Sequence, residues 1–163
     1  MKYIIKKAEK IGGIHMMPSS KSETIRALFL ALLANGKSEI KNFLNCDDTD
    51  TTLGVLKDFN VHVIRQSNKK VIIKNTGLPI NTKAKEINTG NSGITTRFAL
   101  PILGLRENND VPIIFDCGKQ MRKRPIISLV KALNNLGMNI TFLTKHLGCP
   151  LLVKGALSGG TTS

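Results

Sequence analysis

The chain has 163 residues, 41% of them hydrophobic, with 24 Lys and Arg against 11 Asp and Glu, giving a formal net charge of +13. This length supports one domain with a substantial core and argues against two complete ones, and no apolar run approaches the ~18 residues that span a bilayer, so we expect no membrane span. The charge indicates an anionic partner, whether nucleic acid, a phosphorylated metabolite or a membrane surface, while 6 Phe, 1 Tyr and no Trp leave few rings to stack on single-stranded bases.

The cysteines and histidines form no pattern of a metal site or a disulfide framework. The cysteines are odd in number and widely spaced, with no CxxC motif: Cys46, Cys117 and Cys149. This usage is typical of a reduced, cytosolic protein, and the N-terminus has no secretory signal pattern. The histidines have no metal-ligand spacing: His15, His62 and His146. We therefore expect a cytoplasmic chain without a metal or another cofactor.

The N-terminal part of the chain leads into a loop of small polar residues. Residues 2–17 alternate loosely around Gly12-Gly13, which predicts a strand, a turn and a second short strand. Residues 18–21 are a Pro, two Ser and a Lys. The apolar run that follows predicts a largely buried helix over about 22–34, ending at Asn35-Gly36.

Three polar side chains at this junction of loop and helix indicate an anion site. A helix start offers free backbone N–H groups and the positive end of the dipole, and Lys21, Ser22 and Arg26 add two cations and a hydroxyl there. Because Lys21 and Arg26 are about 1.4 turns apart, both reach one ligand only if Lys21 lies on a non-helical lead-in. In the alternative, Ser20 or Ser22 caps the helix and the two cations are solvated.

The first half continues with a strand, a helix and a strand pair, predicted over residues 38–43, about 49–58, 61–64 and 70–74. Asp47 and Asp48 form a carboxylate pair ahead of this helix. We interpret them as its cap, with orientation of a substrate as the alternative.

The same order recurs in the second half. A polar loop at 89–93 enters an apolar helix that carries Arg97 on its first turns. A strand at 111–115 follows, and Arg124-Pro125 opens a further helix with Pro in its first turn. A strand pair closes the half, predicted over residues 139–143 and 150–154.

The chain therefore contains two copies of a βαβαββ unit of roughly 75 residues, over about 18–80 and about 88–158. The predicted fold class is α/β. One such unit cannot cover its own apolar faces, so several units should pack together around shared helices. The sequence stops directly after the second unit, which indicates that a further unit should follow.

Three motifs in register with this repeat carry a resemblance to a known family. Pro18-Ser-Ser-Lys-Ser-x-x-x-Arg26, Asn91-Ser-Gly93 and Arg124-Pro125 stand in the order and approximate spacing of the enolpyruvyl transferases. The Lys-Ser pair at 21–22 and the motif at 121–125 resemble the 5-enolpyruvylshikimate-3-phosphate synthase branch of that family. The resemblance extends from about residue 8 to 160.

The resemblance implies a fold and a reaction. Family members have two domains of three βαβαββ units each, an inverted α/β barrel or prism, with the substrates between them. They transfer the enolpyruvyl group of phosphoenolpyruvate to the 5-hydroxyl of shikimate 3-phosphate, in the pathway to aromatic amino acids. On this reading residues 1–163 are a partial first domain. The third unit, the second domain and its acid–base carboxylates are absent, so the chain alone should be inactive.

The resemblance also implies roles for six residues. Lys21 is the catalytic residue and contacts both substrates, while Ser22 and Arg26 bind shikimate 3-phosphate. The backbone N–H groups of Asn91-Ser92-Gly93 and the Arg124 guanidinium bind phosphoenolpyruvate. The alternatives are a plain turn with a helix cap at 91–93 and a solvated charge at Arg124.

This chain departs from the family pattern near the second loop. Ile94 stands where many relatives have Thr, and Phe98 where Pro is frequent. We therefore expect altered tolerance of phosphoenolpyruvate mimics such as glyphosate. A sister branch that acts on UDP-N-acetylglucosamine uses a catalytic Cys ahead of the Arg-Pro motif. For Cys117 we favour instead a half-buried position at a strand end.

Two readings from other functional classes stay open. The first is a basic RNA-binding or RNA-end-processing module, because RNA 3′-terminal phosphate cyclases use a similar repeated unit. The lack of aromatic clusters and of a cyclase-type His motif argues against it. The other is a non-catalytic half that docks with a separately encoded remainder, because a missing unit leaves apolar helix surface exposed.

Overall fold

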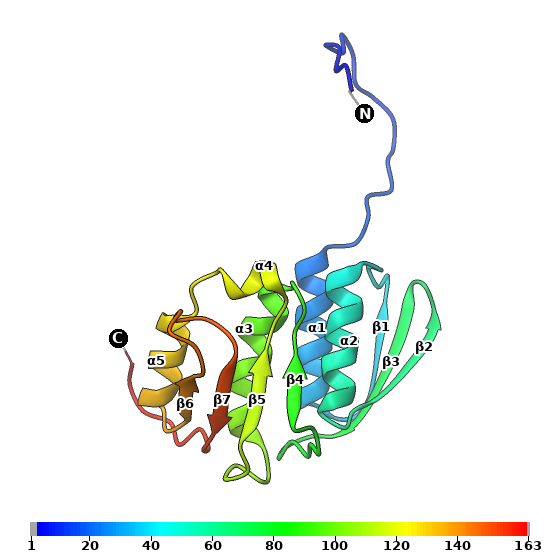
Figure 1. Ribbon diagram of the computed structural model, residues 1–163. Coiled ribbons are helices and arrows are strands. Elements are labelled where there is room, and N and C mark those ends of the chain that lie inside the picture. Colours follow the sequence, from blue (N-terminus) through cyan, green and yellow to red (C-terminus); the bar gives the residue numbers. More distant parts are fainter. Residues whose placement is uncertain (1–2, 163) are drawn as a thin grey trace.

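The computed structural model describes residues 3–162. Two small sheets lie at opposite sides of the body, and α1, α2 and α3 gather between them (Figure 1). Among the described residues no helix is long and apolar enough to cross a membrane.

The first half builds a three-stranded antiparallel sheet and two helices. Its elements are α1 (Lys21–Leu33), β1 (Asn35–Lys41), α2 (Asp47–Asp58), β2 (His62–Ser67) and β3 (Lys70–Thr76). The sheet order is β1-β3-β2. Ile72 of β3 pairs with Glu39 on one side and with Ile64 on the other. The helices α1 and α2 pack against this sheet.

The second half repeats this arrangement. Its elements are β4 (Glu86–Asn88), α3 (Gly93–Ile102), the 3-10 helix η1 (Leu103–Leu105), β5 (Ile113–Asp116), α4 (Lys119–Arg122), α5 (Ile127–Asn135), β6 (Asn139–Phe142) and β7 (Leu151–Lys154). The sheet order is β4-β5-β7-β6, with β4 parallel to β5 and the other pairs antiparallel. The order β5-β7-β6 has the connectivity of β1-β3-β2, so the predicted α/β repeat is confirmed.

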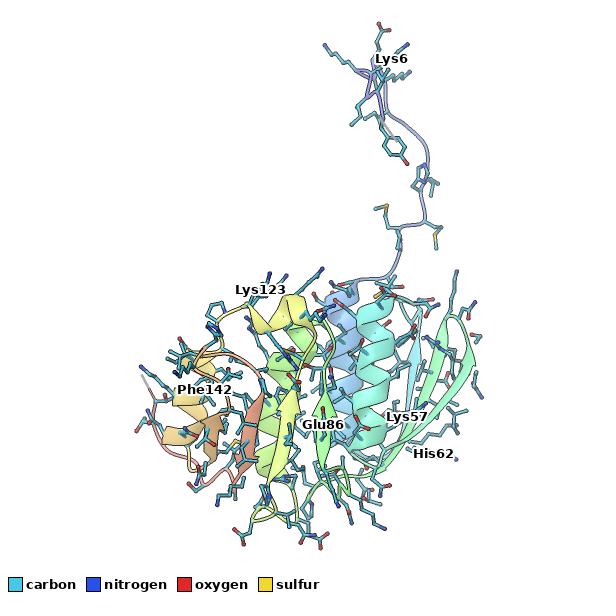
Figure 2. The ribbon with its side chains drawn as sticks, viewed as in Figure 1. Lys6, Lys57, His62, Glu86, Lys123 and Phe142 are labelled. Atoms are coloured by element: carbon cyan, nitrogen blue, oxygen red, sulfur yellow. The ribbon has the colours of Figure 1, made fainter. Side chains whose placement is uncertain are left out.

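The strands expected within residues 2–17 are not present in the described part of that segment, residues 3–17. The segment extends away from the body, with Lys6 at its far end (Figures 1 and 2). Its apolar side chains are exposed, Ile5 by 95% and Ile14 by 100%. Alternating residues form a strand only beside another strand. In the second sheet β4 lies beside β5, whereas residues 3–17 do not occupy the equivalent place beside β1.

Three local expectations about helix starts are wrong. Lys21 is the first residue of α1 and not part of a lead-in. The helix α2 begins at Asp47, and its N-cap is Cys46, whose backbone N–H donates to Thr49 Oγ1 at 3.0 Å. Pro125 lies ahead of α5 and outside it. A residue before proline is disfavoured in helical conformation, so the chain stays irregular at Arg124.

One cluster of buried apolar residues runs through both halves, from Ile25 and Leu28 of α1 to Phe115 of β5 and Val153 of β7. The two halves thus share a core, as the argument from uncovered helix faces predicts.

A buried arginine ties the end of α3 to both halves. Arg106 is 3% exposed and donates hydrogen bonds to three carbonyls, those of Leu103, Asn109 and Val111. Its burial lowers the pKa of the guanidinium. Its own backbone forms a bridge to Ile80, which connects the region after β3 to the second half.

We predict that Arg106→Met lowers the free energy of unfolding by about 2–4 kcal/mol, because the substitution removes three hydrogen bonds. Of their acceptors, the Asn109 carbonyl keeps a donor in the Gly155 N–H. Urea unfolding of the chain measures this. Arg65→Met is the control, since Arg65 is partly exposed and pairs with Asp50 at the surface; its loss should cost less than about 1 kcal/mol. An equal cost for the two variants would contradict the prediction.

Candidate functional site

The starts of α1, α2 and α3 and the turn around α4 surround one open pocket of about 710 Å³. Its lining residues are Lys21, Ser22, Arg26, Asp48, Asn91, Gly93, Ile94, Arg97, Phe98, Gln120 and Arg124. All six residues singled out from the sequence line this pocket. Four cationic side chains face one carboxylate across it, so the pocket suits a ligand with several negative charges.

The start of α1 is fixed by Ser20, whose side chain accepts a hydrogen bond from the Glu23 backbone N–H at 3.3 Å. The capping role proposed as the alternative is therefore correct for Ser20. It does not exclude an anion site, because Ser22 and Arg26 lie one and five residues into the helix and line the pocket. Lys21 and Arg26 both line the pocket although Lys21 lies within the helix, so a non-helical lead-in is not needed to bring their side chains together.

Lys21 is held by a carboxylate of the neighbouring helix. Its Nζ lies 2.7 Å from Asp48 Oδ2, and the Lys21 side chain is half exposed. The hydrogen bond and the charge of Asp48 raise the pKa of Lys21, while nearby Arg124 acts in the opposite direction. Lys21 therefore stays protonated and directed toward the pocket. Asp48 orients this lysine and does not cap α2.

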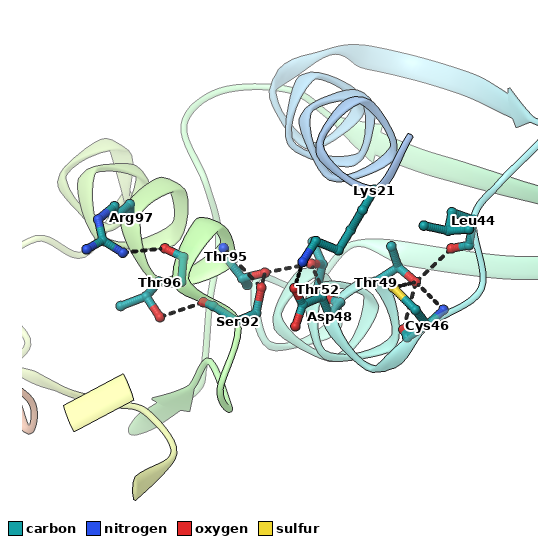
Figure 3. A network of polar contacts seen from close by, with 11 residues as sticks. Lys21, Leu44, Cys46, Asp48, Thr49, Thr52, Ser92, Thr95, Thr96 and Arg97 are labelled. Carbon is teal, nitrogen blue, oxygen red and sulfur yellow. Dashed lines mark hydrogen bonds and ion pairs between the residues drawn. The ribbon is translucent and has the colours of Figure 1, made fainter. Parts of the chain in front are cut away.

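A buried hydroxyl network connects this ion pair to the second loop (Figure 3). Thr52 Oγ1 donates to the Asp48 carbonyl at 2.8 Å and lies 2.8 Å from Thr95 Oγ1. Thr95 Oγ1 in turn lies 2.7 Å from Ser92 Oγ, which caps α3. Both threonines are fully buried. The network thereby sets the position of the 89–93 loop relative to Lys21.

Two guanidinium groups converge on Gly93. Arg97 Nη1 donates to the Gly93 carbonyl at 2.9 Å. A Cβ at position 93 would lie 3.1 Å from Arg97 Nη1 and 3.2 Å from Arg124 Nη1. The missing side chain leaves room for both cations. Gly93 is also the first residue of α3, where a backbone N–H has no acceptor within the helix.

The turn that carries Arg124 is docked onto the 89–93 loop. Asn91 Oδ1 accepts from the Gln120 backbone N–H at 3.2 Å, and Gly118 N–H donates to Gly90 O at 2.6 Å. A Cβ on Gly118 would lie 2.2 Å from Asn91 Oδ1, so this approach requires glycine there. Arg124 is thus brought to the pocket by a loop contact and not by a helix.

The row of three backbone donors expected at 91–93 is not fully available. The Ser92 N–H donates to the Thr89 carbonyl at 3.3 Å, and the Ser92 hydroxyl serves the cap. The turn-and-cap alternative thus describes Ser92 correctly. Asn91 and Gly93 line the pocket on either side of it.

Two polar lining residues received no binding role from the sequence, Arg97 and Gln120, and Asp48 received one only as the alternative to capping. The position of Arg97, equivalent to Arg26 in the first unit, was a usable signal. For Gln120 there was no sequence signal other than its position beside the motif at 121–125. Cys117 is buried and does not line this pocket.

We predict that Thr52→Val and Thr95→Val each lower the free energy of unfolding by about 1–2 kcal/mol, because each removes two buried hydrogen bonds: the one between the threonines, and that of Thr52 to the Asp48 carbonyl or of Thr95 to Ser92. The double variant should be less destabilised than the sum of the two, with a coupling of about 1 kcal/mol. Urea unfolding of the four proteins measures this.

The control cycle pairs Thr52→Val with Thr96→Val. Thr96 is the equally buried neighbour of Thr95 and bonds Thr89 at 2.7 Å. A coupling for Thr52 and Thr95 no larger than in this control would contradict a direct link.

Comparisons with known proteins agree with the motifs. The family model for EPSP synthase (3-phosphoshikimate 1-carboxyvinyltransferase) matches residues 5–163. The 3-phosphoshikimate 1-carboxyvinyltransferase of Acetivibrio thermocellus is 38% identical over 161 residues, 97% of this chain and 36% of the relative. That of Thermococcus kodakarensis is 36% identical over 160 residues, 98% of this chain and 36% of the relative.

Longer proteins and solved structures show the same likeness. The pentafunctional AROM polypeptide of Pneumocystis carinii is 37% identical over 145 residues, 85% of this chain and 9% of that polypeptide. The EPSP synthase structure from Acinetobacter baumannii shares the fold, with a TM-score of 0.81 at 22% identity over 92% of this chain and 34% of that one. The chain spans about a third of the length of the 3-phosphoshikimate 1-carboxyvinyltransferases it matches. With its motifs, its repeat and the match over residues 5–163, the chain belongs to the EPSP synthase family.

Proposed function

We propose that this chain is the part of a 3-phosphoshikimate 1-carboxyvinyltransferase that binds the anionic groups of both substrates. The observation that carries the proposal is that four cations, the starts of three helices and one orienting carboxylate meet in one pocket. Shikimate 3-phosphate and phosphoenolpyruvate each carry a phosphate and a carboxylate. Planar guanidinium groups pair with such groups through two parallel hydrogen bonds.

The proposed roles within the pocket are those that the family resemblance implies, and the positions of the residues support them. Ser22 and Arg26 of α1, together with Lys21, form the side for shikimate 3-phosphate. Lys21 is held there by its ion pair with Asp48. Arg124 and the N–H of Gly93 form the side for phosphoenolpyruvate, with Asn91 holding the turn at 118–120 in place. Lys21 lies between the two sides and is the residue we propose to contact both substrates. There it stabilises negative charge that develops as phosphate leaves.

We further propose that residues 18–80 and 88–158 are two repeated units of a first domain. The remaining unit and a second domain complete the site, in the same polypeptide or as a separate chain. The relatives' greater length supports this proposal, as does exposed apolar surface such as Leu30 on α1, which is 68% exposed. The acid–base groups come from that remainder. A reducing compartment such as the cytoplasm fits three cysteines that are all free thiols.

We predict that Arg124→Ala, in the enzyme that contains this chain, lowers kcat/KM for phosphoenolpyruvate by about 100-fold or more, because an oriented cation at the reacting group is lost. Steady-state kinetics with either substrate varied measure this. Lys57→Ala is the control, since Lys57 is an exposed cation of α2 far from the pocket (Figure 2). Equal effects of the two variants would refute the assignment of Arg124.

We predict that Ile94→Thr makes the enzyme more sensitive to glyphosate. Ile94 lines the pocket in the first turn of α3, and the smaller Thr leaves more room for a compact anion. One methylene in a pocket changes binding by about 10-fold, so inhibition curves should separate by that order. The control is Val111→Thr, an exposed β-branched residue outside the pocket. Comparable inhibition of Ile94→Thr and its parent would contradict the prediction.

A further inference from the structure

Two cysteines far apart in the sequence face each other at the end of a strand pair. The strands β5 and β7 are antiparallel, with Ile113 opposite Val153 and Phe115 opposite Leu151. Cys117 directly follows β5 and Cys149 lies two residues ahead of β7, so the two cysteines lie at the same end of this strand pair.

The two thiols are in direct contact. The hydrogen bond between them is the largest influence on the pKa of each thiol. It lowers the pKa of Cys117 and, together with burial, raises the pKa of Cys149. Both residues are buried, Cys117 at 2% and Cys149 at 6% exposure. They are free thiols, as is Cys46, which lies beside Thr49 at the start of α2 and is partly exposed.

Small molecules reach this pair through a second pocket. Cys149 lines an open pocket of about 810 Å³ together with cationic side chains from the α4 turn and its flank: Lys119, Arg122, Lys123 and Arg124. Arg122 also pairs with buried Asp116 beside Cys117. The charge of Arg122 contributes to the lowered pKa of Cys117, which favours its thiolate and thus its oxidation. Arg124 belongs to both this pocket and the candidate substrate pocket.

We propose that Cys117 and Cys149 are a redox-sensitive pair that a peroxide converts into a cross-strand disulfide. Hydrogen peroxide first oxidises Cys117, the more acidic thiol of the pair, to a sulfenic acid and releases one water. The Cys149 sulfur then attacks the Cys117 sulfur, the S–O bond breaks, and a second water leaves. Two thiols are oxidised, one peroxide is reduced, and a dithiol reductant reverses the change.

The bond acts on the segment that presents Arg124. Cys117 begins the turn that carries α4 and Arg124, and Cys149 ends the loop that packs against this turn. A Cβ on Gly148 would lie only 2.6 Å from the Arg122 carbonyl, so the two segments already touch. A disulfide would hold them together when the rest of the chain loosens. Disulfides in reducing compartments are usually transient or redox-sensing, which fits a pair that is reduced at rest.

The experiment treats the chain with hydrogen peroxide, blocks remaining thiols with N-ethylmaleimide and maps peptides by mass spectrometry. We expect an intramolecular link between the peptides of Cys117 and Cys149, with a mass loss of about 2 Da from two thiols and Cys46 still alkylated. The melting temperature should rise by about 5 °C or more and fall back with dithiothreitol. A link that involves Cys46, or stable sulfenic or sulfinic acid without a link, would overturn the proposal.

Matched variants separate the pair from general oxidation. Cys46→Ser should leave both the link and the thermal shift unchanged, whereas Cys149→Ala should abolish both. If Cys149→Ala fails to fold, peptide mapping of Cys46→Ser decides alone, because that variant leaves the pair intact. The readouts are a covalent link and a thermal shift, so they do not depend on the proposed function.

Discussion

The structure depends on the buried contact between α2 and α3, where Thr52 and Thr95 share a hydrogen bond of 2.8 Å. Inside a dry core such a bond is directional, and breaking it removes one partner from each of two buried hydroxyls. It joins the two repeated halves at one point. From there, contacts continue to Asp48 and Lys21 on one side and to the Ser92 cap on the other. The relative position of the two loops that line the pocket therefore depends on the core.

Four cationic side chains lie together in the pocket because the packed loops and helices around them hold them there. Lys21, Arg26, Arg97 and Arg124 repel one another, and Asp48 offsets only part of their charge. The fold holds three of them by contacts within the chain: Lys21 pairs with Asp48, Arg97 donates to the Gly93 carbonyl, and Arg124 lies on a turn docked to the 89–93 loop. An anionic substrate would then relieve the remaining repulsion, so binding is favoured by charge that the fold has already brought together.

Much of this was predictable from local patterns. The periodicity of 22–34, the polar loops before apolar runs and the repeated order of elements give the helices, the strands and the α/β repeat. The six site residues follow from three motifs in register. The strands expected within 2–17 do not form in residues 3–17, because alternation describes one strand and says nothing about a neighbour to pair with. The start of α5 was misplaced because the restriction that proline imposes on Arg124 outweighs its tolerance within a first turn.

The sequence by itself determined which residues carry charge at the starts of α1 and α3, and to which family the loops are similar, because both depend on residues close together in the chain. Only the tertiary structure decided that Asp48 holds Lys21, that Gly118 admits Asn91 and that Cys117 interacts with Cys149. These contacts join residues 27 to 32 positions apart. Their geometry depends on strand register and on the packing of helices in a shared core, which no local pattern encodes.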